Sequence, residues 1–194
     1  MKKVELPEVI PSKKIVVGNV NAPITLMEFG DYESEACAKA NEAVKAILEA
    51  FPNDVKFIFR HYPLLKIHQK AHKAAEASIA AAQEGKFWEM HNELFANRHS
   101  LGVISLKSHA RDAGVKSKKI LDDLINSYFG LYVQDDLKEG NKMGVTDVPA
   151  FFINGKKFDQ DPTFKNLSAH IKGLSQTTKP AAKPGKAKVV KKAA

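Results

Sequence analysis

The 194-residue sequence contains little cysteine and no long apolar run. Cys37 is its only cysteine, so no disulfide can form within one chain. No stretch stays apolar over the roughly 20 residues that a membrane-spanning helix needs. The basic start, Met1 to Lys3, is not followed by the apolar segment of a secretory signal. We therefore expect a cytoplasmic protein, without a disulfide framework and without a membrane partner.

Acidic residues are missing from residues 175–194, where the basic charge is concentrated. The whole chain has a formal net charge of +8, and this segment contains six lysines with no Asp, Glu or Arg. Subtracting six from eight leaves +2 for residues 1–174. The Lys-Ala-Pro composition predicts a disordered basic tail. Such a tail would contact nucleic acid phosphates weakly and without sequence preference, or would only aid solubility, since it has no aromatic residue to stack on bases.

The first third of the chain has the pattern of a β-α-β unit. Ile24–Phe29 is an apolar run typical of a central strand, and Val55–Arg60 reads as a second strand parallel to it. Ser34 is a good N-cap for the helix between them. Small and apolar residues then recur at spacings of three and four, namely Cys37, Ala40, Val44, Ile47, Leu48 and Phe51. The spacing predicts that Cys37 faces the core.

Helical periodicity dominates the middle of the chain, and strand signals return near its end. We expect about four helices, over residues 71–82, 87–95, 105–113 (with Ser105 as N-cap) and 120–129. Asn154-Gly155 is a strong hairpin signal between two short strands, and a last helix opens at Asp161-Pro162. Residues 1–13 read as a loose lead-in. The fold class is α/β, with segments 1–63, 64–143 (the helical insertion), 144–174 and 175–194 (the tail).

This order of elements, together with several local motifs, resembles the DsbA-like branch of the thioredoxin fold. The stretches that carry the resemblance are Asn21–Ile24, Phe29–Tyr32, Phe59–Leu64, Gly85–Trp88 and Gly144–Lys156. They span roughly residues 15–174, and the sequence is most similar to the short DsbA-family thioredoxin-domain proteins of bacteria. The resemblance implies a thioredoxin fold with an inserted helical subdomain. It also implies a thiol-disulfide oxidoreductase family whose partners are protein thiols and extended peptides.

The departure from the family falls on the reactive residues. By position, Ser34 replaces the attacking cysteine and Cys37 matches the resolving one, so that Ser-x-x-Cys stands in place of Cys-x-x-Cys. A hydroxyl does not enter thiol–disulfide exchange, which needs a thiolate. The resemblance also implies a cis proline at Pro149, facing the helix N-terminus, and a peptide or thiol ligand docked at Val148. Simpler roles for Ser34 and Cys37 are an N-cap and a core residue.

Three functional hypotheses follow, and whether the chain is an enzyme stays open. The first is a DsbA-family relative with impaired redox chemistry that retains peptide or thiol-ligand binding at Ser34 and Pro149. The second is a glutathione-binding enzyme similar to the kappa-class glutathione transferases, which use a serine at this helix N-terminus. Glutathione is the only cofactor considered. The third is a non-catalytic module with a tail that adheres to nucleic acid.

The remaining polar residues give weaker signals. His68 and His72 are four residues apart, as on one helix face, but this pair alone does not make a ligand set, so no metal site is predicted. Asp31, Glu33 and Glu35 surround the start of the first long helix. We interpret them as partners of its dipole at a solvated edge.

Overall fold

The structure is a computed structural model that describes residues 9–178. Within this range, the side chains of residues 120, 121, 124, 125 and 176–178 are not described. The predicted basic tail lies outside the described residues from residue 179 onward.

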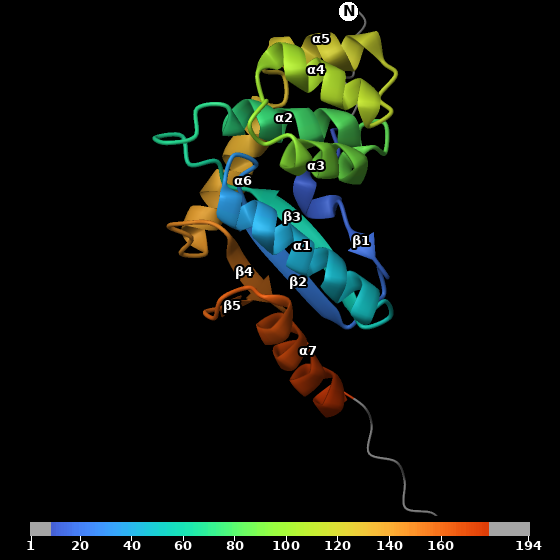
Figure 1. The fold of residues 1–194 in the computed structure, drawn as a ribbon, viewed down its shortest axis with the longest axis vertical. Helices are drawn as coiled ribbons and strands as arrows, with labels where there is room; N and C mark the ends of the chain where they lie inside the picture. Colours follow the sequence, from blue (N-terminus) through green and yellow to red (C-terminus); the bar gives the residue numbers. More distant parts are fainter. Residues whose placement is uncertain (1–8, 179–194) are drawn as a thin grey trace, which may run out of the picture.

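A five-stranded mixed sheet forms the centre of the molecule, with the strand order β1-β3-β2-β4-β5 (Figure 1). The strands are β1 (Val17–Gly18), β2 (Ile24–Gly30), β3 (Val55–His61), β4 (Ala150–Ile153) and β5 (Lys156–Phe158). The two central strands, β2 and β3, are parallel, and the other pairings are antiparallel. A β-α-β crossover and an antiparallel hairpin thus share one sheet, which confirms the predicted thioredoxin arrangement.

Two helices of the thioredoxin core pack against each other beside the sheet. Helix α1 (Glu35–Ala50) lies along the sheet, and α7 (Phe164–Thr178) follows β5 and contacts α1 (Figure 1). The predicted core stripe of α1 is confirmed, because its buried residues are Cys37, Ala40, Asn41, Val44 and Ile47. Helix α7 continues to Thr178, so the predicted start of a disordered tail at residue 175 is wrong.

Five helices separate β3 from β4 and gather beyond one end of the sheet (Figure 1). They are α2 (Ala71–Ala82), α3 (Phe87–Ala96), α4 (Val103–Asp112), α5 (Lys118–Ile125) and α6 (Gly130–Lys142). Helix α4 begins after Gly102, so Ser105 lies inside it and is not its N-cap. The helix expected over residues 120–129 ends at Ile125, and Ser127 follows with a positive φ of 55°.

Helix α6 was missing from the sequence-based expectation of four helices. Its buried positions are Val133, Asp136 and Gly140, which have the helical spacing of three and four. Only one of the three is apolar, because Asp136 binds the buried side chains of Arg60 and His61 and Gly140 lies against an aromatic ring. A search for apolar periodicity therefore cannot detect this helix.

The lead-in segment is docked where loose structure was expected. Residues Ser12–Lys14 form a 3-10 turn, and Val9 and Ser12 are both buried. The Ser12 hydroxyl donates a hydrogen bond to Oδ2 of Asp136. The described part of the lead-in is thus tied to the helical insertion.

Candidate functional site

The turn between β2 and α1 is held by the carboxylate of Asp31. Its Oδ1 accepts the backbone N–H of Glu33 at 2.7 Å, and its Oδ2 accepts the N–H of Leu64 at 2.8 Å and Nδ1–H of His68 at 2.9 Å. The side chain is buried, so the predicted position at a solvated edge is wrong for Asp31. This carboxylate instead joins the turn before α1 to the loop that follows β3.

The two flanking acids also bind specific groups. Glu33 accepts the backbone N–H of Lys70 through Oε2 at 2.7 Å, which gives the same loop a second attachment. Glu35 is exposed and pairs with Lys39 at 2.8 Å and, more distantly, with Arg98 at 3.8 Å. Of the three acids, Glu35 in the first turn of α1 is the one placed as a dipole partner.

Ser34 and Cys37 meet at the N-terminus of α1. Ser34 is the N-cap, and its Oγ accepts the backbone N–H of Cys37 at 3.3 Å. The Cys37 side chain has an exposed fraction of 0%. Burial raises the pKa of the Cys37 thiol well above its ordinary value, and the nearby Glu28 carboxyl adds to this shift, while a hydrogen bond from Ser34 opposes it. The surviving thiol is therefore protonated at neutral pH and shielded from solvent.

Glu28 is a buried acid that the sequence analysis did not single out. It lies in β2, and its Oε1 has no hydrogen-bond partner among the described residues. Burial raises the pKa of this carboxyl well above its ordinary value, so Glu28 favours its neutral form. A glutamate inside an otherwise apolar strand was the available signal.

The loop before β4 approaches the first turns of α1. The Val148–Pro149 peptide bond is cis. Val148 is buried, Pro149 is partly exposed, and the N–H of Val148 donates to Oδ1 of Asp147 at 2.8 Å. The hydroxyl of Tyr62 holds the start of this loop by donating to the Val145 carbonyl at 2.9 Å.

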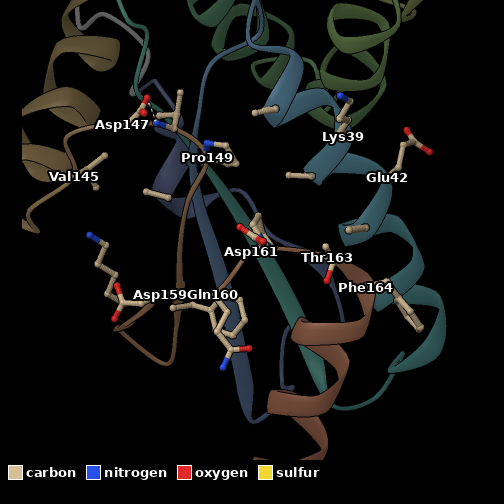
Figure 2. A pocket seen from close by; sticks show the side chains of 18 of the residues that line it. Lys39, Glu42, Val145, Asp147, Pro149, Asp159, Gln160, Asp161, Thr163 and Phe164 are labelled. Carbon is tan, nitrogen blue, oxygen red and sulfur yellow. Dashed lines mark hydrogen bonds between the residues drawn. The ribbon is translucent and has the colours of Figure 1, made fainter.

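A groove of about 890 Å³ runs between this loop, α1 and the connection from β5 to α7 (Figure 2). On the α1 side its wall is built from the small residues Ala36, Ala40, Ala43 and Ala46. Val148 and Pro149 lie on the opposite side, so both predicted ligand-binding residues line the groove. Ser34 and Cys37 do not line it, because Ser34 is the N-cap before the helix and the Cys37 side chain is buried on the core face of α1.

The histidines have separate partners. Because α2 begins at Ala71, His68 precedes the helix and does not share a face with His72. His68 binds Asp31, whereas Nδ1 of His72 lies 3.2 Å from Glu76. Within residues 9–178, no three side chains of His, Cys, Asp or Glu are grouped as metal ligands.

Comparison with known proteins assigns the fold and the family. A family model described as thioredoxin matches residues 11–173. Oxidised BdbD from Bacillus subtilis superposes with a TM-score of 0.77 and 25% identity, covering 86% of this chain and 96% of BdbD. The α-DsbA1 protein of Wolbachia pipientis shares the fold with a TM-score of 0.73 at 21% identity, covering 89% of this chain and 94% of that chain.

The curated relatives are much longer proteins. The chain is 35% identical over 149 residues to a Na⁺/H⁺ antiporter NhaA 1 of Mycolicibacterium gilvum, and the match covers 76% of this chain but only 24% of that relative. The chain thus spans about a quarter of the length of these relatives. No helix among the described residues is both long and apolar enough to cross a bilayer. By its fold, its family match and its solved neighbours, the chain belongs to the DsbA-like branch of the thioredoxin family.

Proposed function

We propose that this protein binds extended peptides or thiol ligands beside its cis-proline loop and does not complete a thiol–disulfide exchange cycle alone. The observation that carries the proposal is the state of the two reactive positions. Ser34 caps α1 with a hydroxyl and is itself buried, and the remaining thiol of Cys37 is fully buried with a raised pKa. Exchange requires an accessible thiolate, and this pair supplies none.

The geometry around the groove supports a retained binding role. The groove is concave and has small apolar residues in its walls, which are properties of a ligand site, and Val148 and Pro149 line it. The resemblance to the DsbA-like family implies that the backbone beside the cis proline pairs with an extended peptide. Here the N–H of Val148 is occupied by the Asp147 carboxylate. A peptide carbonyl would therefore have to displace that carboxylate to reach this amide.

The experiment is to restore the missing thiol with Ser34→Cys. The introduced thiolate, at a helix N-terminus that lowers thiol pKa values, attacks one sulfur of a substrate disulfide and expels the other as a thiolate. Cys37 then attacks the mixed disulfide, the second substrate thiolate leaves, and the protein retains an internal disulfide. Dithiothreitol then reduces this internal disulfide and closes the cycle, so we expect Ser34→Cys to accelerate insulin reduction over dithiothreitol alone and the unmodified chain to give no acceleration.

The double variant Ser34→Cys/Cys37→Ala is the matched control, because it can form the mixed disulfide but cannot resolve it. It should accumulate the trapped adduct and turn over slowly. If the single variant folds with an unchanged unfolding temperature but shows no exchange, the site is not a preserved exchange site and the proposal fails. Exchange by the unmodified chain would equally contradict it.

A second candidate is a glutathione-binding role, and the Ser34 hydroxyl favours it. This hydroxyl stands at the N-terminus of α1, where its oxygen accepts the backbone N–H of Cys37, so it lies where the resemblance to the kappa-class transferases implies a hydroxyl beside the sulfur of the ligand. In a glutathione complex it would turn to the ligand's thiolate. Saturable glutathione binding that Ser34→Ala weakens would support this candidate, and its absence would remove it.

A further inference from the structure

We propose that the groove beside Pro149 is occupied by the chain's own basic segment, residues 179–194, which competes with external peptides for the same surface. This inference rests on the proposed peptide-binding function of the groove. It adds the class of segment that the groove selects, namely an extended, lysine-rich one.

The charge of the groove is the first argument. Its rim includes Asp147, Asp159 and Asp161, and within residues 9–178 no Lys, Arg or His is within ion-pair distance of any of them. Figure 2 places Asp147 beside Pro149, and Asp159 and Asp161 on the connection that leads into α7. The carboxylates thus lie on more than one wall of the hollow and attract a cationic segment laid along it.

The cations on the same rim do not neutralise these carboxylates. Lys39 is paired with Glu35 at 2.8 Å on the face of α1, and Glu42 is satisfied by Lys45 at 2.8 Å. Lys157 remains as a single exposed cation against three aspartates. The groove therefore has an excess of negative charge, and residues 179–194 contain six lysines and no acid.

The length of the chain is the second argument. Helix α7 starts at Phe164 on the groove rim and has 15 residues, so its last residue lies about 22 Å from the groove. Residues 179–194 span up to roughly 50 Å when extended, so less than half of this segment is needed to return to the groove. Its small Ala residues can also pack against the alanines that form one wall of the groove.

The tether makes weak contacts effective. A segment joined through α7 is present at a millimolar effective concentration near the groove. Surface ion pairs of this kind are screened by salt, so the occupancy should fall as ionic strength rises. In the cell, an external peptide would then have to outcompete the tail to reach the cis-proline loop.

The test compares the full chain with a chain that ends at Thr178. A fluorescent synthetic peptide of residues 179–194 is titrated into each, and binding is followed by anisotropy. The shortened chain should bind the peptide, more weakly as salt is added, and the full chain should bind it about tenfold more weakly because the tethered copy competes. Equal affinities for the two chains, or no binding by the shortened chain, would overturn the proposal.

Charge reversal locates the site. In the shortened chain, Asp159→Lys/Asp161→Lys should abolish peptide binding. The control Asp112→Lys/Asp135→Lys carries the same charge change on exposed positions of α4 and α6 and should leave it intact. If the groove variant and the control variant bind the peptide equally well, the peptide binds elsewhere and the proposal is refuted. If the groove variant does not fold, Asp159→Asn/Asp161→Asn makes the same test with a smaller change.

The outcomes are separable from those of the proposed function. If the full and shortened chains bind the peptide equally while the Ser34→Cys variant catalyses exchange, only the basic segment is refuted as the occupant of the groove. If the tethered segment weakens binding of the synthetic peptide but the Ser34→Cys variant is folded and inactive, only the preserved exchange site is refuted.

Discussion

At the residue scale, the site combines a hydroxyl, a buried thiol and a buried acid. Ser34 satisfies the backbone at the start of α1, Cys37 fills the core beneath it, and Glu28 lies in the adjacent strand, where Oε1 has no partner among residues 9–178. An unpartnered buried acid is costly in its charged form, so the chain retains a group that reduces its own stability. Such groups are common at functional sites.

Glu28 makes stability depend on pH in a predictable direction. The pKa of the Glu28 carboxyl in the folded protein lies above the unfolded value of about 4.5. Between these two pKa values the folded state binds more protons than the unfolded state, so the free energy of unfolding falls as pH rises through this range. Each pH unit costs about 1.4 kcal/mol until the folded-state pKa is reached. Glu28→Gln should remove this decline, so its stability relative to the unmodified chain increases as the pH rises above about 5.

Urea unfolding across that pH range measures the effect. The exposed Glu49→Gln provides the control, since it loses the same charge without burial. A Glu28→Gln protein whose stability runs parallel to that of the unmodified chain would show that Glu28 is already ionised in the folded state.

At the element scale, α6 determines how the helical insertion meets the sheet. Gly140 faces the ring of Tyr62, and an added Cβ would stand 2.7 Å from Cδ2 of Tyr62 and 3.2 Å from Cδ1 of Phe29. The Tyr62 ring cannot easily move, because its hydroxyl bonds Asn141 at 2.6 Å as well as the Val145 carbonyl. The close approach of α6 to β2 and β3 therefore requires glycine here.

Two helical glycines make a matched pair for testing this contact. Gly140→Ala should lower the free energy of unfolding by about 1–3 kcal/mol through overpacking. In Gly173→Ala, the added methyl group in α7 meets no described atom within 4 Å, and the change should raise the free energy of unfolding by up to about 1 kcal/mol, because alanine favours the helix. Denaturant unfolding of both variants compares them directly, and a stabilised Gly140→Ala protein would contradict the packing described here.

At the scale of the whole molecule, Asp136 joins three parts of the chain. From α6 its carboxylate accepts bonds from Nε of Arg60 at 2.7 Å, from the backbone and Nδ1 of His61 at 3.0 and 2.8 Å, and from the Ser12 hydroxyl. It thereby links the helical insertion to β3 and to the docked lead-in. Burial alone would raise the pKa of Asp136, but the bonds and charges of His61 and Arg60 outweigh it and hold the pKa below its ordinary value.

Asp136→Asn should therefore destabilise the protein by about 3–5 kcal/mol near neutral pH, as breaking one partner of a buried ion pair does. Since the folded pKa is depressed, this stabilisation exists above the unfolded pKa and is lost as pH falls through the folded one. The two proteins should converge in acid. Asp135→Asn, on an exposed neighbour paired with Lys138, is the control and should change stability by less than about 0.5 kcal/mol. Equal effects of the two substitutions, measured by chemical unfolding, would exclude this linking role.

Local sequence patterns were sufficient for the elements whose signals depend on neighbouring residues. The strands of the β-α-β unit, the Ser34 cap, the inward face of Cys37 and the turn at Asn154 and Gly155, both with positive φ, follow from period, capping and turn chemistry. The replacement of a thiol by a hydroxyl at residue 34 is likewise visible in the sequence. These features alone determine that no two-cysteine cycle can occur within one chain.

The tertiary structure decided what depends on partners far apart in the chain. Asp31 links two segments because the backbone of Leu64 and the side chain of His68 bind its carboxylate. Helix α6 is held by buried residues that are mostly not apolar, so its sequence shows no apolar periodicity. Likewise, Glu28 becomes a buried acid only once β2 lies between β3 and β4 in the sheet. The acidic rim of the groove exists only once the cis-proline loop and the connection into α7 come together. Burial and long-range pairing set the charge and reactivity of these groups, and neither quantity can be read from sequence-local patterns.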